Sequence, residues 1–306
     1  MKHALSTQPL TLARPMVVQG HGLHSNVPCT VSLRPVDAPT GLRFVHLPSG
    51  TEIAASADRV GDLSLATTLT SGTIKLGTVE HLLSALAGLQ IDHARIEVTG
   101  TELPILDGSA APWLAALDAA GTRTLPGSRR FIRILRPVEV VQGNKWIRVS
   151  PHEGFRIRYS ISFDHPSIGR QSRELTLTPD RYRRELGAAR TFCLERDIET
   201  MRSMGLALGG SLDNAVVYGP NGPLNEALRF EDEAVRHKML DLVGDLALLG
   251  APLLGLVEAH AAGHAMHVSL AKAILGDPTA WTWSEVEAKP RRSIFGTSLQ
   301  PHPIPA

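Results

Sequence analysis

Residues 229–250 of this chain read RFEDEAVRHKMLDLVGDLALLG, and they predict one helix that carries an unusual polar stripe. At 3.6 residues per turn, the four-residue spacing places His237, Asp241 and Asp245 on nearly the same side. Much of the remaining helix surface is apolar, so we expect the helix to be largely buried. A buried polar stripe of this kind needs an interaction partner that offsets the cost of desolvation. A neutral imidazole and a carboxylate one helical turn apart could together bind a metal ion.

The stripe also fits a solvated ion pair, because charged residues between positions 231 and 236 form a polar helix face just before it. Zinc normally takes three or four ligands from the protein. The pair His237 and Asp241 therefore needs a third ligand from elsewhere in the chain before the sequence predicts a metal site.

The composition is that of a globular protein. The chain has 306 residues, 43% of them hydrophobic and 20% charged, and this length favours two domains. A formal net charge of +1 excludes strong steering toward nucleic acid, and the short basic clusters are too local to form a nucleic-acid surface. We therefore expect no nucleic-acid partner.

The cysteines and the apolar stretches indicate a cellular compartment. Cys29 and Cys193 lie far apart without a Cys-x-x-Cys pattern, which fits a reducing environment. The N-terminus lacks an apolar run of signal-peptide length, and the stretch 246–257 is broken by Gly250 and Pro252 and is too short for a membrane span. We expect a cytoplasmic monomer without stable membrane insertion.

Residues 122–130 predict a linker, because they interrupt the periodicity and contain adjacent Pro and Gly. They divide the chain into an N-terminal domain, 1–126, and a C-terminal domain, 127–306. Helices are expected at 79–87, 112–120, 179–186, 231–249 and 265–275, and strands at 27–33, 94–98, 131–135, 146–149, 155–163 and 255–259. Each half mixes strands with about two helices, so the predicted fold class is α+β, with a structural duplication suggested by the similar element order.

The helix of the first half offers a third metal ligand. It opens with the sequence TVEHL at 78–82, with Thr78 as the expected N-cap and Glu80 in the first turn, where the helix dipole favours an ionised carboxylate. His81, His237 and Asp241 together would leave one zinc position open, which is typical of a catalytic site. Glu80 would then be the base that activates water. Taken alone, the motif also fits an ordinary acidic first turn followed by a histidine.

A hydrolytic site also needs a group that stabilises an oxyanion and protonates a leaving amine. His264 follows an expected strand and the turn at 261–263, where a side chain can face a cleft. Asp245 could orient this imidazole and hold it cationic. By spacing alone, His260 and His267 are equally available for the role.

Seven motifs occur in order along the chain: GLHS at 22–25, TVEHL at 78–82, ELPILDGSA at 102–110, RTF at 190–192, LGGS at 208–211, RFEDE at 229–233 and HKMLD at 237–241. Together they resemble the UDP-3-O-acyl-N-acetylglucosamine deacetylase family of lipid A biosynthesis, over about residues 10–275. The resemblance implies a zinc amidohydrolase that removes acetate from the glucosamine nitrogen of a UDP-sugar carrying one 3-O-hydroxyacyl chain. It also implies two α+β domains of similar topology, each a sheet packed against helices, with the active site between the helix layers.

The resemblance assigns the catalytic residues by position. The family's zinc ligands fall on His81, His237 and Asp241, and its general base falls on Glu80, in agreement with the set inferred from the residues. Its electrostatic and acid histidine falls on His264, with Asp245 beside it. The hydroxyl residue that polarises the substrate carbonyl falls on Thr191.

The resemblance also assigns the substrate contacts, each of which equally fits an ordinary core aromatic or surface residue. Phe192 and Lys238 match positions that contact the sugar, Lys145 and His24 match positions near the diphosphate, and Phe163 matches an aromatic that stacks on uracil. The segment 194–217 resembles the insert that forms the acyl-chain passage. Its apolar side chains would supply the wall, or could be plain core: Leu206, Ala207, Leu208, Leu212, Val216 and Val217.

One position departs from the family pattern. Ala261 stands where the family often has a lysine that contacts a phosphate of the nucleotide, so this contact is absent. Either His260 or another basic group compensates for it, or the nucleotide is held more weakly.

Motifs of two unrelated enzyme classes are incomplete or missing. The sequence GHGLHS at 20–25 lacks the third glycine of a dinucleotide fingerprint, and no Gly-x-Ser-x-Gly is present to supply a serine nucleophile. The alternatives that remain are a zinc deacetylase of another N-acetyl sugar and a non-catalytic zinc-stabilised module that binds a sugar nucleotide.

Overall fold

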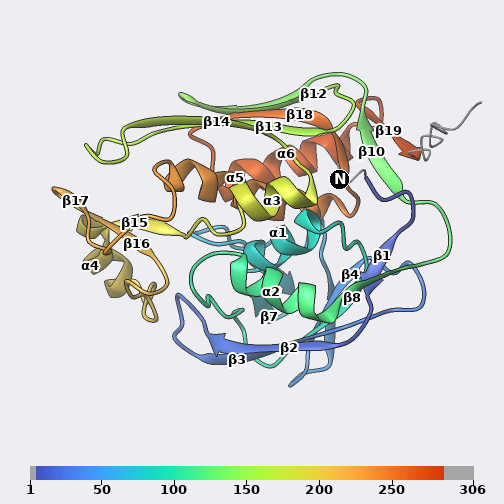
Figure 1. The fold of residues 1–306 in the computed structure, drawn as a ribbon, viewed down its shortest axis with the longest axis horizontal. Helices are drawn as coiled ribbons and strands as arrows, with labels where there is room; N and C mark the ends of the chain where they lie inside the picture. The colour runs from blue at the N-terminus through green and yellow to red at the C-terminus, as the bar shows by residue number, and fades with distance from the viewer. Residues whose placement is uncertain (1–4, 286–306) are drawn as a thin grey trace, which may run out of the picture.

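The computed structural model describes residues 5–285 and arranges them in four layers, a sheet on each outside and helices between them (Figure 1). One sheet and two helices come from the first half of the chain, and the second sheet and its helices come from the second half. This confirms the α+β class.

The sheet of the first half has the strand order β2-β3-β8-β4-β5. These strands span Met16–His21, Pro28–Arg34, Ala94–Val98, Leu42–His46 and Thr51–Ala54. The inner-facing residues alternate along β3, where Cys29, Val31 and Leu33 are buried, as expected of a sheet with one face on the core. A short 3-10 turn, Ala57–Arg59, and the hairpin β6 (Leu69–Ser71) and β7 (Ile74–Leu76) lead into the helices α1 (Glu80–Gly88) and α2 (Ala111–Ala120).

The sheet of the second half is larger and has the order β11-β12-β18-β10-β19, with β13 also pairing with β18 and β14 with β13. Its strands are β10 (Arg130–Ile134), β11 (Val138–Gln142), β12 (Lys145–Ser150), β13 (Phe155–Ser162), β14 (Arg170–Thr176), β18 (Leu253–His260) and β19 (Trp281–Glu285). The helices α5 (Glu233–Leu246) and α6 (His264–Gly276) cover it, and α3 (Pro179–Glu185) lies beside them (Figure 1).

A small unit projects at one end of the layers (Figure 1). It contains β15 (Phe192–Leu194), α4 (Glu195–Ser203), β16 (Val216–Gly219) and β17 (Gly222–Pro223). It overlaps the segment 194–217 in which the sequence predicted an acyl-chain passage.

Two sequence predictions are wrong in detail. The expected linker 122–130 contains a strand, β9 (Thr122–Thr124), which pairs with β1 (Leu10–Leu12) and so belongs to the packed structure. The helix expected at 231–249 begins at Glu233, and its last turn, Ala247–Leu249, is a separate 3-10 turn that ends at Gly250 in the left-handed conformation. The proposed boundary after residue 126 lies between β9 and β10, but one apolar core runs through both halves, so the division into two domains stays a prediction.

Thr78 is not the N-cap of α1. The cap position belongs to Val79, and Thr78 has a φ of 56°, in the left-handed region. Its hydroxyl donates to Oε1 of the buried Glu102, 3.1 Å away. That carboxylate also accepts hydrogen bonds from the backbone of His24 and Ser25, which draws the loop of the GLHS motif toward the start of α1.

Candidate active site

A cavity of about 870 Å³ opens where the helix layers meet the projecting unit. Its size is within the range of small-molecule sites. The lining combines the polar ends of the helices with apolar side chains of the projecting unit. It includes most of the residues singled out in the sequence: His24, Glu80, His81, Lys145, Phe163, Thr191, Phe192, His237, Lys238, Asp241 and His264.

Close packing of α1 on α5 places the first half of the site against the second. A Cβ atom at Gly244 would lie 2.1 Å from the carbonyl oxygen of Glu80, so only glycine permits this approach. One turn further along α1, Ser84 donates to the carbonyl oxygen of Leu240 across the interface, at 2.7 Å. The start of α1 is thereby held beside the middle of α5.

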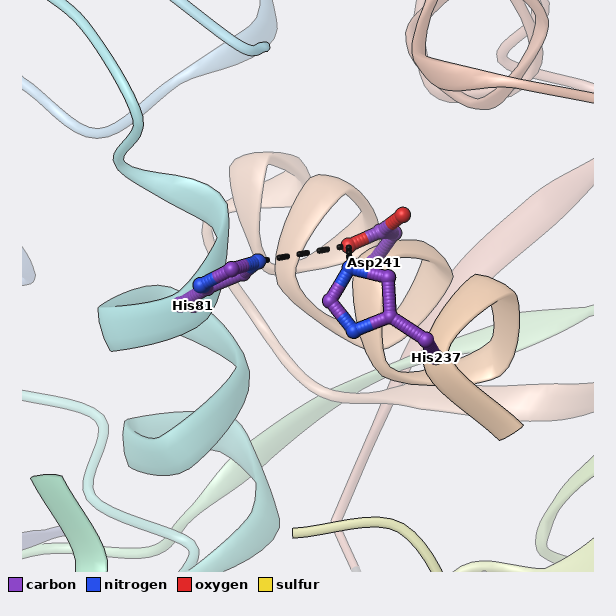
Figure 2. A group of neighbouring side chains, drawn as sticks. All are labelled: His81, His237 and Asp241. Carbon is purple, nitrogen blue, oxygen red and sulfur yellow. Dashed lines mark ion pairs between the residues drawn. The ribbon is translucent and has the colours of Figure 1, made fainter. Parts of the chain in front are cut away.

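His81, His237 and Asp241 meet at this crossing, and we refer to them as the open group (Figure 2). Oδ1 of Asp241 lies 3.2 Å from Nε2 of His237 and 3.7 Å from Nε2 of His81. The two imidazole rings are nearly perpendicular, with their centroids 5.0 Å apart. All three side chains are buried.

The hydrogen bonds of the open group favour a cation at its centre. Nδ1 of His237 lies 3.0 Å from the carbonyl oxygen of Ala189, which only accepts, so the proton of the neutral ring is on Nδ1 and Nε2 carries a lone pair. Among residues 5–285, the buried atoms Oδ1 of Asp241 and Nδ1 of His81 have no hydrogen-bond partner. Electron-pair donors that face each other without a proton between them need a positive charge.

The spacing of the open group fits a metal ion. Ligands held about 2.0 to 2.2 Å from a tetrahedral zinc lie roughly 3.3 Å from one another. The separations of Oδ1 of Asp241 from the two imidazole nitrogens, 3.2 and 3.7 Å, bracket that value. Two histidines and one carboxylate would leave a fourth position for a substrate or water molecule.

The electrostatics keep both histidines of the open group available as ligands. Burial and the neighbouring His237 together lower the pKa of His81 to about 3, against the opposing influence of Asp241. Burial likewise lowers the pKa of His237. Burial alone would raise the pKa of Asp241, but His237 and Lys238 hold it well below its usual range. Neutral imidazoles and an ionised carboxylate are the forms that bind a metal.

Glu80 lies beside His81 in the first turn of α1 and faces the same cavity. Its Oε2 accepts a hydrogen bond of 3.0 Å from the backbone amide of Thr67. Burial raises the pKa of Glu80 to about 8, an effect that His264 opposes and that Asp245 and Asp241 reinforce. A carboxyl group with a pKa near neutrality is suited to taking up and releasing a proton.

Asp245, His264 and His267 form a second cluster, which we refer to as the closed group. Nδ1 of His264 and Nδ1 of His267 each lie 2.8 Å from Oδ2 of Asp245. Burial alone would lower the pKa of His264, but Asp245 and Asp241 raise it to about 9. Nε2 of His264 lies 3.9 Å from Oδ2 of Asp241, so this ring joins the closed group to the open one.

The structure separates the three histidines that sequence spacing left equivalent. His264 begins α6 and lines the cavity, and His267 is fully buried behind it. His260 ends β18, where Nδ1 is 2.9 Å from the hydroxyl of Ser160 and the ring stacks on Trp146. Of the three, only His264 lines the cavity.

Thr191 is held at the cavity by a buried ion pair. Its amide donates to the carbonyl oxygen of Gly108, at 2.8 Å. The preceding Arg190 is bound through Nε and Nη2 to both carboxylate oxygens of Glu233, at 2.9 and 3.1 Å. Because Glu233 is the first residue of α5, this pair fixes the segment 190–192 to the helix that carries His237.

Three further sequence-predicted residues surround the open group. The ring of Phe192 stands edge-on to that of His237, with centroids 6.4 Å apart, and edge-on to that of Phe163, at 5.5 Å. Nζ of Lys238 donates to Oδ2 of Asp241 at 3.0 Å, and it lies 6.0 Å from the ring centre of Phe192. These side chains form one wall of the cavity.

The basic groups of the cavity wall include one that the sequence analysis did not select. His24 lines the cavity with an Nε2 that has no partner among the described residues, and the exposed Lys145 lies at its rim. Arg202 of α4 also lines it, whereas Ala261 and His260 do not. Ala261 instead has a φ of 49° in the turn between β18 and α6.

The predicted apolar wall is only partly right. Ala207, Leu212 and Val217 line the cavity, but Leu206, Leu208 and Val216 do not. Val216 and Val217 are neighbours in β16, so they point to opposite sides, and Val216 faces the core with no exposed surface. Leu208 is 48% exposed. The structure adds Ile198 and Met201 of α4 to the wall.

Sequence reasoning missed Thr67 and Tyr159, which are fully buried beside the closed group. The hydroxyl of Thr67 donates to Oδ1 of Asp245 at 2.6 Å, and its amide binds Glu80. The hydroxyl of Tyr159 lies 2.9 Å from Nε2 of His267. No motif marks either residue, because each acquires its role from elements distant in the sequence.

Between residues 5 and 285, none of the helices combines the length and the apolar character that crossing a bilayer requires.

Comparison with known proteins gives consistent matches. The family model described as "LpxC: UDP-3-O-acyl N-acetylglycosamine deacetylase" matches residues 9–276. A protein of Anaeromyxobacter sp. (strain Fw109-5) named UDP-3-O-acyl-N-acetylglucosamine deacetylase is 46% identical over 269 residues, 88% of each chain. Proteins of the same name from Acidithiobacillus ferrooxidans and Stenotrophomonas maltophilia (strain K279a) are 44% identical over 281 residues, which cover 90% of this chain and 92% and 93% of theirs.

Proposed function

Because this chain belongs to the LpxC family of deacetylases, we propose that it hydrolyses the N-acetyl group of UDP-3-O-(hydroxyacyl)-N-acetylglucosamine. The reaction would depend on zinc, release acetate and serve lipid A biosynthesis. The observation that carries the proposal is the open group, in which Nε2 of His81 and the lone pair on Nε2 of His237 face a buried, unpartnered oxygen of Asp241 beside Glu80.

The residues of the open group support zinc as the cofactor. Two imidazole nitrogens and one carboxylate oxygen are ligands that zinc accepts in catalytic sites, where a fourth position stays open. When bound there, zinc would supply Lewis-acid chemistry, lowering the pKa of a water molecule and polarising a carbonyl. Lys238 would hold the carboxylate of Asp241 in place through the other oxygen.

Glu80 would act as the general base. It would take a proton from the attacking water while the water oxygen adds to the amide carbonyl carbon. The amide of Thr67 would keep the carboxylate turned toward the cavity. Thr191, which also lines the cavity, would donate its hydroxyl hydrogen to the carbonyl oxygen as negative charge develops there.

His264 would stabilise the oxyanion and then protonate the leaving nitrogen. Asp245 and Asp241 favour the cationic ring that these roles require. As the carbon–nitrogen bond breaks, the proton of His264 would pass to the nitrogen, so that the products are acetate and the free amine. Glu80 would return its proton to the imidazole or to solvent.

The remaining cavity residues would bind the substrate. We assign Phe192 and Lys238 to the sugar, Lys145 and His24 to the diphosphate and Phe163 to the uracil ring. Arg202 is a further cationic group at the cavity and a candidate for the charge that Ala261 lacks. Ile198, Met201, Ala207, Leu212 and Val217 would provide the apolar wall for the acyl chain.

Two other functions remain to be separated from this one. A deacetylase of a different N-acetyl sugar would keep the catalytic residues but would not depend on the acyl chain. A binding module stabilised by zinc would keep the open group but would not need Glu80 beside it or His264 across from it.

The test measures metal content and acetate release of the purified chain. We expect turnover of the acylated UDP-sugar and far slower turnover of UDP-N-acetylglucosamine without the chain, because the apolar wall would contribute binding to the first alone. Equal rates would favour the different-sugar deacetylase, and absence of acetate release from either compound would favour the binding module.

Glu80→Ala tests the assignment of the base. We expect the variant to retain its metal and to lose turnover by roughly a hundredfold to ten-thousandfold, the usual contribution of a general base. Glu52→Ala, an exposed glutamate on β5, is the matched control and should behave as the unaltered chain. Unchanged turnover in Glu80→Ala would rule out Glu80 as the base.

A further inference from the structure

Asp245 is fully buried and receives hydrogen bonds from three side chains, one on the segment just before β6 and two on α6. The hydroxyl of Thr67 donates to Oδ1 at 2.6 Å, and His264 and His267 lie at 2.8 Å from Oδ2. An ionised carboxylate only accepts, so both imidazoles donate through Nδ1. Although burial alone would raise the pKa of Asp245, His264 and His267 hold it at about 2.

The closed group has the composition of a metal site but not its geometry. Ligand atoms around a tetrahedral zinc would be roughly 3.3 Å apart. Both imidazole nitrogens instead lie at hydrogen-bonding distance, 2.8 Å, from one oxygen of Asp245. The protons on those nitrogens occupy the directions that a metal would need, so hydrogen bonds rather than an ion hold this group together.

His267 takes no part in the chemistry proposed above, yet it is fixed at both ring nitrogens. Nδ1 is bound to Asp245, and Nε2 lies 2.9 Å from the hydroxyl oxygen of Tyr159. Nε2 is therefore an acceptor, and the hydroxyl hydrogen of Tyr159 is shared between it and the carbonyl oxygen of Ala262, 2.8 Å away in the turn that leads into His264. Tyr159 is fully buried on β13, and its ring stands edge-on to that of His267, with centroids 5.9 Å apart.

We propose that His267 is a positioning residue for the reaction. By donating to Oδ2 of Asp245 while anchored on Tyr159, it fixes the plane of that carboxylate and thereby the orientation of the His264 ring toward the cavity. This inference rests on the proposed function, because it is His264 that would act on the substrate. His267 itself does not line the cavity and is not a member of the open group.

The geometry explains why the second donor matters. Oδ2 of Asp245 would bind His264 alone if His267 were replaced by a residue without a donor at the Nδ1 position. One acceptor direction of a buried carboxylate would then be empty, and the carboxylate could rotate about its own bond toward Thr67. The ring of His264 would lose its fixed angle, which lowers the rate of the chemical step more than it weakens binding.

Two substitutions separate this role from simple packing. The side-chain nitrogen of asparagine reaches about as far as Nδ1 of histidine, whereas that of glutamine reaches about as far as Nε2. His267→Asn therefore keeps a donor for Asp245 and loses the contact with Tyr159, and His267→Gln does the reverse. The same two substitutions at His46, a buried histidine on β4 that binds Ser49, are the matched controls.

We expect His267→Gln to lower kcat for the acylated UDP-sugar by roughly tenfold or more, with KM within about twofold of the unaltered value. His267→Asn should recover kcat to within about threefold, and both variants should keep the metal content of the unaltered chain. Equal kcat values in the two variants, whether normal or equally low, would overturn the proposal.

A measurement independent of turnover follows the proton between His264 and Asp245. With histidine-selective nitrogen-15 labelling, the Nδ1 proton of His264 is identified by its loss in His264→Asn. We expect its exchange with water to be slow in the unaltered chain and in His267→Asn, and faster in His267→Gln. If exchange stays slow in His267→Gln, the positioning role of His267 is contradicted, whatever the substrate proves to be. If the unaltered chain releases no acetate, only the proposed substrate is contradicted.

Tyr159→Phe provides a second variant should glutamine at position 267 prevent folding. It keeps the buried ring and removes only the hydroxyl that anchors His267 and the turn at Ala262. We expect kcat to fall by roughly threefold to tenfold without a matching rise in KM. An unaltered kcat would overturn the part assigned to Tyr159.

Discussion

The open group and the closed group contain the same residue types, two histidines and one aspartate, and their aspartates are one turn apart on α5. In the open group, one carboxylate oxygen and two imidazole nitrogens face each other at 3.2 and 3.7 Å, and that oxygen has no hydrogen-bond partner among the described residues. In the closed group, both imidazoles donate to the aspartate at 2.8 Å, and a threonine satisfies its other oxygen.

The difference lies in which ring nitrogen faces the aspartate, Nε2 in the open group and Nδ1 in the closed group. The backbone carbonyl of Ala189 takes the Nδ1 proton of His237, so Nε2 of that ring reaches Asp241 as a lone pair. In the closed group, Nδ1 itself faces Asp245, so each ring reaches the carboxylate as a donor. Two clusters of equal composition can therefore differ in function: one needs a cation, and the other is held together by its own hydrogen bonds. The tautomer set by a neighbouring group decides between the two.

The largest effect should come from breaking the open group. We expect His237→Gln to lose the metal and to lower turnover by at least about a thousandfold, because several kcal/mol of charge stabilisation disappear with the ion. The measurement is acetate release beside metal content, with His46→Gln as the control for replacing a buried histidine. Turnover within about tenfold of the unaltered chain would show that the open group is not the metal site.

Breaking the closed group should have a smaller effect and spare the metal. In Asp245→Asn, the amide oxygen can still accept from His264 and His267, but the negative charge that favours a cationic His264 is gone. We expect kcat to fall by roughly tenfold to a hundredfold at unchanged metal content. Loss of the ion in this variant would mean that the two groups are not independent, and an unaltered kcat would mean that His264 needs no partner.

A still smaller effect on turnover should follow from moving α1 away from α5. The added methyl group of Gly244→Ala would meet the carbonyl oxygen of Glu80, so we expect the free energy of unfolding to fall by about 1 to 3 kcal/mol. Turnover should fall by a few-fold, because Glu80 and His81 would shift relative to His237. Denaturant unfolding checks the first expectation. The control is Gly276→Ala at the end of α6, where no atom lies near the added carbon. Equal stability of the two variants would show that the packing of α1 on α5 does not depend on this close approach.

Much of the fold could be predicted from periodicity, and so could part of the site. The apolar residues around the stripe predicted the buried helix α5, and the spacing of His237, Asp241 and Asp245 predicted that they share one side of it. The sequence paired this helix with the one that carries His81 only by assuming that a metal needs a third ligand. In the structure, the ligand atoms of His81, His237 and Asp241 lie within 4.8 Å of one another.

The residue roles that sequence spacing could not predict depend on partners from distant segments of the chain. Asp241 and Asp245 are equivalent on a helix diagram, and only the approach of α1 to one and α6 to the other distinguishes them. Thr78 was wrongly expected to cap α1, because Glu102, remote in the sequence, draws its hydroxyl away. Thr67 is invisible to any local pattern for the same reason.

The contrast between the two groups requires that the open group binds the metal and the closed group does not. Crystals of the protein grown with zinc, measured with X-rays on both sides of the zinc absorption edge, would locate each ion directly. We expect one anomalous peak per chain, about 2.0 to 2.2 Å from Nε2 of His81, Nε2 of His237 and Oδ1 of Asp241. A peak between Asp245, His264 and His267, or the absence of one at the open group, would contradict this contrast.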